Sequence, residues 1–483
     1  MNFIKKYINN KFRFLALFFV IIAVPFFSGC GSSSSSGYLV DLEIWGTYDD
    51  SLAYTEIINQ YKKINPYAGE IKYRKFSQDT YRQELIDALA SGQGPDIFLI
   101  NNSWLPSFKN KIYPAPTPFI SEQEMKSSFP DVVAADFMSD GKVYAVPLSV
   151  DSMVLYYNRD AFNSVGIAAP PTTWKEFQDD VKKLTIIDAA GNITRSGAAI
   201  GTAQNVSVFS DLISMLMLQS GVEMPMQKGV LAKLDQGIVS PNGNVVQAGE
   251  QVLDFYTQFA KLTAGNNVKN PFYTWNSRQP NSVDAFAGGT TAMMFNYSWK
   301  NSEIKSKNPK LNYMVAPVPQ IYPTSPVTVA NYFGYAVSLN KNTPTASAVN
   351  VQTVAPVSND IRTHEAWQFL RFLTLKNSGT IKLYNAVTKN PKDFPISFDP
   401  ALEYLKKTNQ PAARRDLIEA QKLDAFLGSF ALGNLIAKNW YKANPDEIDI
   451  IFANMIESVV NNSGGTLHDA LFLASNKVNA LSR

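Results

Sequence analysis

Polar and apolar residues follow two alternating patterns at the start of the body of the chain. They alternate one by one over residues 38–45, which is typical of a strand, and apolar residues recur at helical spacing over residues 51–64. The succession repeats, with strands predicted over residues 70–76 and 96–100 and a helix over residues 80–90 between them. This strand-helix-strand-helix-strand order predicts an α/β fold with a parallel sheet and helices on its faces.

Later segments continue with the same two patterns. Helices are predicted over residues 207–219, 248–262, 365–375, 401–407, 412–430, 445–461 and 466–481, and strands over residues 291–295, 311–318 and 331–339. Thr173 and Glu176 stand three residues apart before an apolar run, which predicts a capping box at a helix start. Residues 340–359 are polar and contain two prolines, so a long surface loop is predicted there.

Residues 146–158 form an apolar run that contains a single charge, Asp151. Pro147 cannot donate a hydrogen bond to a sheet ladder, so it predicts a sheet edge or a change of sheet. The apolar neighbours predict extended chain that passes through a protected place. Asp151 is therefore interpreted either as a buried carboxylate that is paired inside the protein or as a ligand contact.

Length and charge limit the class of protein. A chain of 483 residues is too long for one simple core, which predicts two lobes or domains. The net charge is +3, but the first 29 residues contain four basic residues and no acidic one, which leaves −1 for the rest of the chain. A basic excess that is confined to the N-terminus argues against a nucleic-acid partner.

The N-terminus has the pattern of an export signal. A basic segment over residues 5–13 precedes a short apolar segment over residues 14–27. The alternative is an uncleaved membrane anchor, but the apolar segment is short for a spanning helix, which needs about 20 residues. We therefore expect an exported protein.

The residues that follow this signal resemble the bacterial lipobox, in which a cysteine becomes the lipidated first residue of the mature protein. Here Cys30 follows two small residues and is the only cysteine in the chain, although Phe27 stands where leucine is usual. The resemblance implies a lipoprotein signal peptide over residues 1–29 and a lipid on Cys30. The serine-rich residues 30–37 are then a flexible tether between the lipid and the folded body.

Motifs for catalysis and metal binding are absent from the sequence. The two histidines, His364 and His468, have no partner at metal-ligand spacing, and one cysteine forms neither a disulfide framework nor a thiolate metal site. No phosphate-binding loop, dinucleotide fingerprint or nucleophile elbow occurs. We therefore expect no catalytic residue, no metal and no cofactor. A surface glycan-processing enzyme stays open as an alternative, because 41 acidic residues offer many carboxylate pairs.

Aromatic and short polar residues gather where two predicted parallel strands end. Trp45, Tyr48 and Asp49 follow the first strand, and Asn101, Ser103 and Trp104 follow the third. Ligands of parallel α/β sheets collect at the carboxyl ends of the strands. Flat aromatic faces stack on sugar rings while polar side chains bond the hydroxyl groups, so this composition favours a carbohydrate ligand.

An ordered series of short motifs runs through the body of the chain. The motifs are Trp45, GQGPD at residues 92–96, GKVYAVP at 141–147, LYYNRD at 155–160, PTTWKEF at 171–177, FAGGTTAM at 286–293, APVP at 316–319 and AWQFLRFL at 366–373. In this order they resemble the extracellular solute-binding proteins of bacterial ABC importers, the family that includes maltose-binding protein. Each motif is weak alone, and the specificity comes from their number and order.

This resemblance implies a two-lobed periplasmic-binding-protein-like fold (type II), in which each lobe is a mainly parallel sheet flanked by helices and the lobes are joined by hinge strands. Lobe one is expected at residues 38–149 plus about 338–374, and lobe two at residues 150–337 plus about 375–483. Residues 146–158 are then the first hinge strand, with partners near residues 336–339 and 374–376. A ligand is expected in the cleft between the lobes.

The resemblance also implies site residues and partners. The residues carried over by motif are Trp45, Asp49, Asn101, Ser103, Trp104, Asp151, Trp299 and Trp440, with Tyr441 as an alternative to Trp440. The tyrosines Tyr48, Tyr297 and Tyr332 are further candidate ligand-binding residues, although the chain departs from the family at Tyr297. The expected partners are a small-molecule solute, most consistent with a sugar, and the membrane permease of an importer. The protein is expected to be a monomer, lipid-anchored on the extracytoplasmic face of the cell membrane. A peptide, a polyamine or an anion is the alternative ligand, although an anion would require converging cations, which these segments lack.

Overall fold

The computed structural model describes residues 38–240, 243–263, 268–342, 345–348, 351–463 and 465–482. The signal peptide, the tether and the lipid on Cys30 are predictions that lie outside the described residues. Among the helices that the structure does describe, none combines the length and the apolar character needed to cross a membrane.

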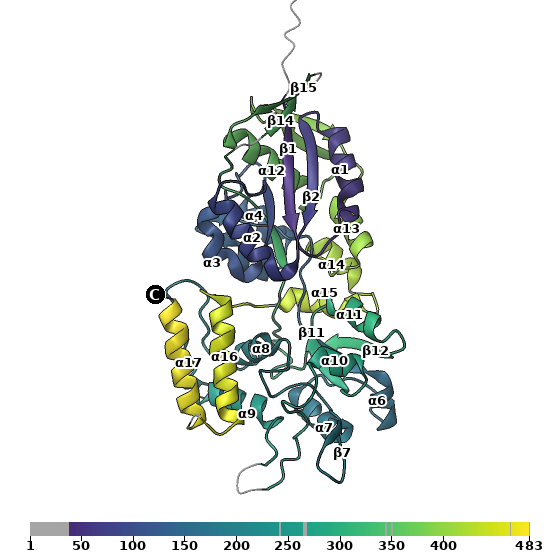
Figure 1. The fold of residues 1–483 in the computed structure, drawn as a ribbon, viewed down its shortest axis with the longest axis vertical. Coiled ribbons are helices and arrows are strands. Elements are labelled where there is room, and N and C mark those ends of the chain that lie inside the picture. Colours follow the sequence, from purple (N-terminus) through teal and green to yellow (C-terminus); the bar gives the residue numbers. More distant parts are fainter. Residues whose placement is uncertain are drawn as a thin grey trace, which may run out of the picture. The chain divides into compact units, whose positions relative to one another are not determined.

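The first sheet forms from the predicted succession of strands and helices. β1 (Tyr38–Gly46) pairs in parallel with β2 (Ala68–Lys75) and with β3 (Ile97–Asn101). Helix α1 (Leu52–Ile64) connects β1 to β2, and helix α2 (Gln78–Ala90) connects β2 to β3 (Figure 1). The predicted β-α-β-α-β order is therefore confirmed.

Segments from far along the chain complete this sheet. β13 (Phe333–Val337) pairs antiparallel with β3, β14 (Thr345–Ala348) pairs antiparallel with the start of β1, and β15 (Val351–Pro356) pairs with β14. The prediction of a long surface loop over residues 340–359 was therefore wrong. Strands near a sheet edge tolerate proline and polar residues, because part of their ladder is unpaired, and the hydrophobic pattern of such strands is weak.

The first hydrophobic core packs against this sheet and includes the fully buried Trp367 and Phe369. The other helices and hairpins around it are η1 (Asn102–Trp104), α3 (Leu105–Phe108), η2 (Lys109–Lys111), α4 (Glu122–Ser128), α5 (Asp131–Phe137), α12 (Asn359–Thr374), α13 (Pro400–Thr408), α14 (Arg415–Gln421), the pair β4 (Met138–Ser139) and β5 (Lys142–Val143), and the pair β16 (Thr380–Tyr384) and β17 (Pro391–Pro395).

The second sheet has the order β11–β6–β12 and is antiparallel. β6 (Val154–Asn158) lies between β11 (Met293–Asn296) and β12 (Tyr313–Pro317). The first sheet has a parallel centre, β2–β1–β3, to which β13, β14 and β15 add antiparallel pairings, so it is mixed, and the expectation of a mainly parallel sheet was wrong for the second sheet. Strand direction depends on the path of the connections, which the alternation of polar and apolar residues does not encode.

Two further hydrophobic clusters surround the second sheet and include Phe177, Met215 and Phe286. The elements here are α6 (Arg159–Ser164), α7 (Trp174–Leu184), α8 (Phe209–Gln219), α9 (Ala248–Gln258), α10 (Ser282–Ala287), α11 (Lys300–Lys307), α15 (Leu427–Ile436), α16 (Pro445–Val460), α17 (Leu467–Leu481), and the pairs β7 (Ile186–Ile187) with β8 (Ile193–Arg195) and β9 (Ile238–Val239) with β10 (Val245–Val246). The predicted capping box is confirmed at the start of α7.

Residues 146–158 pass from the first core to the second. Val146 and Val150 belong to the first core, whereas Met153 and Leu155 belong to the second. Along this path Val146 bridges to Tyr335, Ser149 to Ala412 and Ser152 to Ala330. The partner near residues 336–339 was therefore predicted to within one residue, whereas residues 374–376 are replaced by the segment around Ala412.

Residues after 375 are divided between the two cores, in contrast to the predicted lobe boundary. Ile381, Tyr404 and Ile418 are buried in the first core, and the chain returns to the second core with α16 and α17, which lie side by side (Figure 1). The single helix predicted over residues 412–430 is instead α14 followed by α15. An amphipathic pattern predicts that a helix has a buried face, but it does not say which core buries that face.

Candidate ligand-binding cleft

Two adjoining cavities lie where the chain passes between the cores, and Asn331 lines both. The first, here called the aromatic chamber, has a volume of about 50 Å³ and is lined by Tyr48, Asp49, Leu99, Leu148, Ser149, Asp151, Ser298, Trp299, Asn331, Tyr332, Phe333, Tyr335, Tyr404 and Gln410. The second, the polar chamber, has a volume of about 40 Å³ and is lined by Asn101, Asn102, Ser103, Asp211, Ser214, Val329, Ala330, Asn331, Asn439, Trp440 and Lys442. Together we call them the cleft.

Asp151 anchors the turn that carries Trp299 into the aromatic chamber. Its carboxylate oxygens accept hydrogen bonds from the backbone N–H of Ser298 at 3.0 and 2.9 Å, and the Ser298 hydroxyl donates a further bond to the same group. Asp151 is 4% exposed, and this burial raises its pKa to about 7, although the bonds from Ser298 act in the opposite direction. The carboxylate is thus both a buried paired group and part of the cavity wall.

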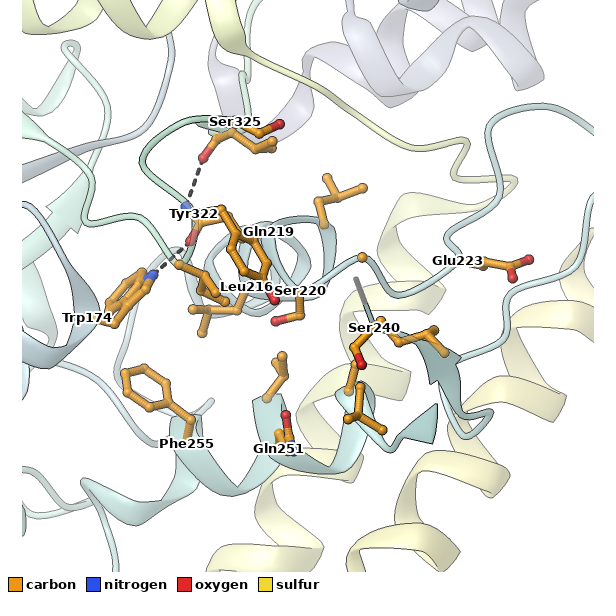
Figure 2. A pocket seen from close by; sticks show the side chains of 18 of the residues that line it. Trp174, Leu216, Gln219, Ser220, Glu223, Ser240, Gln251, Phe255, Tyr322 and Ser325 are labelled. Atoms are coloured by element: carbon orange, nitrogen blue, oxygen red, sulfur yellow. Dashed lines mark hydrogen bonds between the residues drawn. The ribbon is translucent and has the colours of Figure 1, made fainter. Parts of the chain in front are cut away.

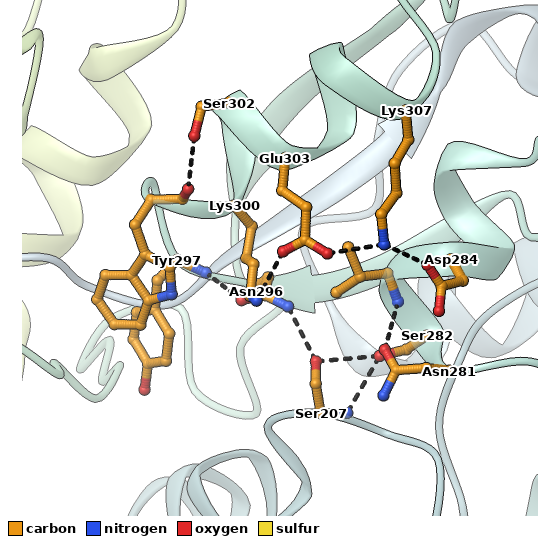
Figure 3. Close-up of polar contacts among 12 residues, drawn as sticks. Ser207, Asn281, Ser282, Asp284, Asn296, Tyr297, Lys300, Ser302, Glu303 and Lys307 are labelled. Carbon is orange, nitrogen blue, oxygen red and sulfur yellow. Dashed lines mark hydrogen bonds and ion pairs between the residues drawn. The ribbon is translucent and has the colours of Figure 1, made fainter. Parts of the chain in front are cut away.

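The turn after β11 is held by a set of polar contacts from α11 and neighbouring loops (Figure 3). The Asn296 side chain accepts from the backbone N–H of Tyr297 at 3.0 Å and donates to the hydroxyl of Ser207 at 3.1 Å. Further along α11, Glu303 lies 2.8 Å from both Lys300 and Lys307 (Figure 3). These contacts fix the start of α11, and Trp299 stands immediately before it.

Tyr297 supports the ring of Trp299 from below. The two rings are stacked, with centroids 4.6 Å apart and planes 22° apart. Tyr297 is fully buried and its hydroxyl donates to Asp211 at 2.7 Å, while Trp299 stays partly exposed. An aromatic face that is rigidly backed and open on its other side suits stacking against a flat apolar ligand surface.

The opposite wall of the aromatic chamber comes from the turn after β1. The Tyr48 ring lies 6.3 Å from the Trp299 ring and 5.0 Å from the Phe333 ring. Burial, together with the nearby Asp151 carboxylate, raises the pKa of Tyr48 well above its usual range, so its hydroxyl stays neutral. Gln78 donates a hydrogen bond to this hydroxyl at 3.0 Å.

Asp49 forms the floor of the same chamber and is surrounded by tyrosines. Its carboxylate accepts from the hydroxyls of Tyr54 at 2.7 Å and Tyr404 at 2.9 Å. The Tyr54 hydroxyl also bonds the hydroxyl of Tyr335. Burial raises the pKa of Asp49, against the effect of the two tyrosine hydrogen bonds. A carboxylate that already accepts two bonds keeps limited capacity for a ligand hydroxyl.

The polar chamber is lined by amides and one ion pair. Asn101 donates to the side chain of Asn331 at 2.8 Å and accepts from the hydroxyl of Ser103 at 2.7 Å. Asp211 pairs with Lys442 at 3.1 Å. Burial opposes ionisation of Asp211, but Lys442 and the Tyr297 hydroxyl outweigh it and lower the pKa of Asp211. The charges of this chamber therefore satisfy each other, and its remaining groups are neutral donors and acceptors.

Asp136 on α5 ties together three segments behind the cleft. Its carboxylate accepts from Asn439 at 2.7 Å, from the hydroxyl of Tyr332 at 2.9 Å and from Asn102 at 3.1 Å. Burial raises the pKa of Asp136 to about 7 in spite of these bonds. Tyr332 is thereby fixed by its hydroxyl while its ring lines the aromatic chamber.

Eight of the eleven candidate residues line the cleft, and three do not. Those that line it are Tyr48, Asp49, Asn101, Ser103, Asp151, Trp299, Tyr332 and Trp440. Trp45 is buried in the first core, with its ring 4.4 Å from that of Phe76, and Trp104 packs against Phe108 with centroids 5.7 Å apart. Tyr297 is the buried support described above. Contact of any of these residues with a ligand stays a prediction.

Trp440 lines the polar chamber but is largely occupied by contacts within the protein. Its ring stacks on Phe452 with centroids 5.9 Å apart, and its indole N–H donates to the hydroxyl of Ser214 at 3.1 Å. With 6% of its surface exposed, it is chiefly a packing residue of the second core. Tyr441, the alternative, lines neither chamber.

Several cleft residues were missed by the sequence analysis. Phe333 and Asn331 flank a candidate, Tyr332, and Ser298 precedes Trp299, so position next to a predicted residue was a usable signal. The other missed residues, which include Asp211, Tyr404, Gln410, Asn439 and Lys442, come from separate helices and loops and carry no local motif. No group of three or more metal-ligating side chains comes together within the described residues.

Comparison with known proteins places this chain in a family. Residues 56–390 match the family described as bacterial extracellular solute-binding protein. A binding protein of Brucella abortus (strain 2308) is 23% identical over 324 residues, which cover 67% of this chain and 69% of that protein. A diacetylchitobiose binding protein of Streptomyces coelicolor is 24% identical over 255 residues, which cover 52% of this chain and 54% of that protein.

Solved structures share the two-lobed fold. The cyclic alpha-maltosyl-1,6-maltose binding protein from Arthrobacter globiformis aligns with a TM-score of 0.65 at 17% identity, over 92% of this chain and 99% of that one. The sugar-binding protein MalE from Xanthomonas citri aligns with a TM-score of 0.65 at 16% identity, over 92% and 97%. The family match, which spans more than half of the sequence, shows that this chain belongs to the bacterial extracellular solute-binding proteins.

Proposed function

We propose that this protein is the solute receptor of an ABC importer and that it binds a carbohydrate in the cleft between its two cores. The observation that carries the proposal is the pairing of Tyr48 with Trp299. Their rings approach to 6.3 Å from the two sides of the cleft, and they are surrounded by serine, asparagine, glutamine and tyrosine side chains and by the carboxylates of Asp49 and Asp151, which already accept hydrogen bonds within the protein. Aromatic faces combined with neutral polar groups suit sugar rings. The sugars named for the Streptomyces and Arthrobacter proteins give independent support.

The charges of the cleft favour a neutral ligand over a peptide, a polyamine or an anion. An anion needs an available cation, and the Lys442 ammonium in the polar chamber is already paired with Asp211. A polyamine needs available carboxylates, and Asp49 and Asp151 already accept bonds from Tyr54, Tyr404 and Ser298. Binding a charged solute would therefore break existing pairs, whereas a polyol adds hydrogen bonds without removing a charge from its partner.

The hydrogen bonds that Asp49 and Asp151 already accept also favour a binding function over catalysis. Glycoside hydrolysis needs one carboxylate as acid and another as base or nucleophile, both directed at the scissile bond. Asp49 and Asp151 are instead directed at tyrosine hydroxyls and at the turn before α11. We therefore propose a receptor without turnover.

Binding requires the cleft to widen. Its chambers measure about 50 and 40 Å³, whereas pockets for small-molecule ligands occupy about 300–1,000 Å³. Residues 146–158 and the segment around Ala330 cross between the cores and are bridged to each other at Ser152. We propose that these crossing segments act as the hinge on which the two lobes open to admit the sugar and close around it.

The N-terminal predictions complete the proposal. A lipid on Cys30 and the tether over residues 30–37 would hold a monomeric receptor on the extracytoplasmic face of the cell membrane, within reach of the permease. One lipid chain binds a membrane only marginally, so stable anchoring would need more than one chain.

A thermal-shift screen of the purified chain tests the proposal. A ligand that binds only the folded state raises the melting temperature by mass action. Screened against separate panels of oligosaccharides, peptides and polyamines, the protein should respond to an oligosaccharide. If only peptides or polyamines raised the melting temperature, the proposal of a sugar ligand would be wrong. If the pure protein hydrolysed a glycan continuously, the proposal of a receptor without turnover would be wrong.

A further inference from the structure

A second, much larger pocket lies within the second core. It has a volume of about 990 Å³ and opens between α8, α9, the β9–β10 hairpin and the segment that precedes Val327 (Figure 2). None of the residues that line it lines either chamber of the cleft. Its volume lies at the upper end of the range for small-molecule sites, which is about 300–1,000 Å³.

The floor of this pocket offers no free hydrogen-bonding group. The indole N–H of Trp174 donates to the side-chain oxygen of Gln219 at 2.7 Å (Figure 2). The amide nitrogen of Gln219 donates to the carbonyl oxygens of Pro319 at 3.1 Å and Val327 at 2.8 Å. Both side chains are 6% exposed. Since these polar atoms are already paired, the floor offers mainly ring and aliphatic carbons to whatever enters.

The walls of the pocket combine apolar side chains with the hydroxyl groups of Ser220, Ser240, Thr324 and Ser325. Leu216 and Phe255 lie around the open centre (Figure 2), and Val252 also lines the pocket. At the mouth, Val239 and Tyr322 are 72% and 51% exposed. Apolar side chains that surround a concavity and are left open to water indicate a surface that binds something apolar.

The charges of this region stand at the rim and do not call for a charged ligand. Glu223 is paired with Lys233 at 2.6 Å, and Lys438 is exposed to solvent. The Gln251 side chain, also exposed at the rim, makes no hydrogen bond with any described residue. A ligand with a neutral body can therefore bury its apolar part below while a polar end meets Gln251 or water.

We propose that this pocket is a second ligand site, separate from the cleft, that takes a neutral molecule with a flat apolar body and one hydrogen-bonding end. The proposal goes beyond the proposed sugar-binding function and does not depend on it. Burial of two fused or linked aromatic rings against Phe255 and the aliphatic side chains of the pocket would provide the affinity through the hydrophobic effect.

The probe for a direct test is N-phenyl-1-naphthylamine, a neutral aromatic amine with one N–H whose fluorescence rises in apolar surroundings. Titrated with the full chain, it should bind saturably at one site. Leu218→Trp places a large ring at the wall of the pocket and should weaken probe binding by about tenfold or more. Leu432→Trp is the matched control, because Leu432 is 47% exposed on α15 and does not line the pocket. The affinity of this variant for the probe should stay within about twofold of the wild-type affinity.

A second variant covers the case in which Leu218→Trp fails to fold. Ile321→Asp adds a carboxylate at the mouth, where Ile321 is 36% exposed, so folding should persist while probe binding weakens by about tenfold. Wild-type affinity in a folded Leu218→Trp or Ile321→Asp protein would overturn the proposal. The absence of saturable binding by the wild type would also overturn it, and so would loss of probe binding in Trp299→Ala, since that result would put the probe in the cleft.

Discussion

The carboxylate of Asp151 accepts hydrogen bonds from both the backbone N–H and the hydroxyl of Ser298, which lies 147 residues further along the chain. Asp151 belongs to the segment that crosses between the cores, and Ser298 directly precedes Trp299. The bond therefore connects the crossing segment with the aromatic wall of the cleft. It links the one charge of an apolar run to the positioning of the tryptophan proposed to stack on the ligand.

Asp151→Ala tests this connection. The change leaves two buried donors of Ser298 without an acceptor, which should lower the free energy of unfolding by about 1–3 kcal/mol. Asp151→Asn keeps one side-chain oxygen and should lose less. Urea unfolding of the three proteins measures both effects. Equal stability of Asp151→Ala and the wild type would mean that the bond does not hold this turn.

The buried Glu365 predicts a pH dependence of stability. Glu365 accepts from Tyr61 and Asn65 at 2.6 Å each, and burial raises its pKa from 4.5 to about 7. Between about pH 4.5 and about pH 7, the carboxyl group of Glu365 therefore stays protonated in the folded state, whereas in the unfolded chain it is already ionised. Stability from this group is present at low pH and is lost as the pH rises from about 4.5 to about 7.

Glu365→Gln removes this titration. Between about pH 5 and about pH 7, the unfolding free energy of the wild type should fall more steeply than that of the variant, by up to about 1.4 kcal/mol per pH unit. Glu84→Gln makes the same change on the exposed side of α2 and should leave the slope as it is in the wild type. Parallel pH profiles for wild type and Glu365→Gln would show that Glu365 is not protonated in the folded state.

Local pattern predicted the first half of the fold well and the long-range pairings poorly. β1, β2 and β3 with their helices follow from alternation and helical spacing alone. The hairpin of β14 and β15, the antiparallel direction of the second sheet and the packing of α13 on the first core depend on pairing between distant segments. Such pairing is decided by which faces meet, and no local pattern encodes it.

Trp45→Ala tests whether Trp45, a predicted ligand contact, is instead a packing residue of the first core. Trp45 is 7% exposed and packs on Phe76, so its truncation should lower the free energy of unfolding by about 3–5 kcal/mol. Denaturant unfolding followed by circular dichroism measures the loss. A Trp45→Ala protein that has wild-type stability but no affinity for the ligand would instead indicate that Trp45 contacts the ligand in the cleft.

The residues of the cleft, like the elements of the fold, could be predicted from the sequence only in part. Tyr48, three residues past Trp45 and beyond the end of β1, reaches the aromatic chamber, while Trp45 within the strand turns to the core. Aromatic composition alone does not separate these two, because an aromatic side chain serves packing and stacking equally well. Asp211 and Asn439 enter the cleft from separate elements, so only the folded chain reveals them.

Cys30→Ser tests the proposed membrane anchor. Without the thiol no lipid can be attached, so the variant should move from the membrane fraction to the soluble extracytoplasmic fraction when produced in a bacterial host. Immunoblotting of the two fractions measures this. A Cys30→Ser protein that stays in the membrane fraction after high-salt washing would favour an uncleaved N-terminal anchor.

Calorimetric titration of the carbohydrate selected by the thermal-shift screen, into the wild type and into Trp299→Ala, tests the central claim most directly. Trp299 is partly exposed, so its truncation should leave the melting temperature nearly unchanged while it removes a stacking face. We expect the wild type to bind one sugar molecule per chain. The affinity of Trp299→Ala for the same sugar should be at least about tenfold weaker than that of the wild type. Equal affinity of the two proteins, or heat from a peptide where every carbohydrate is silent, would contradict sugar binding in this cleft.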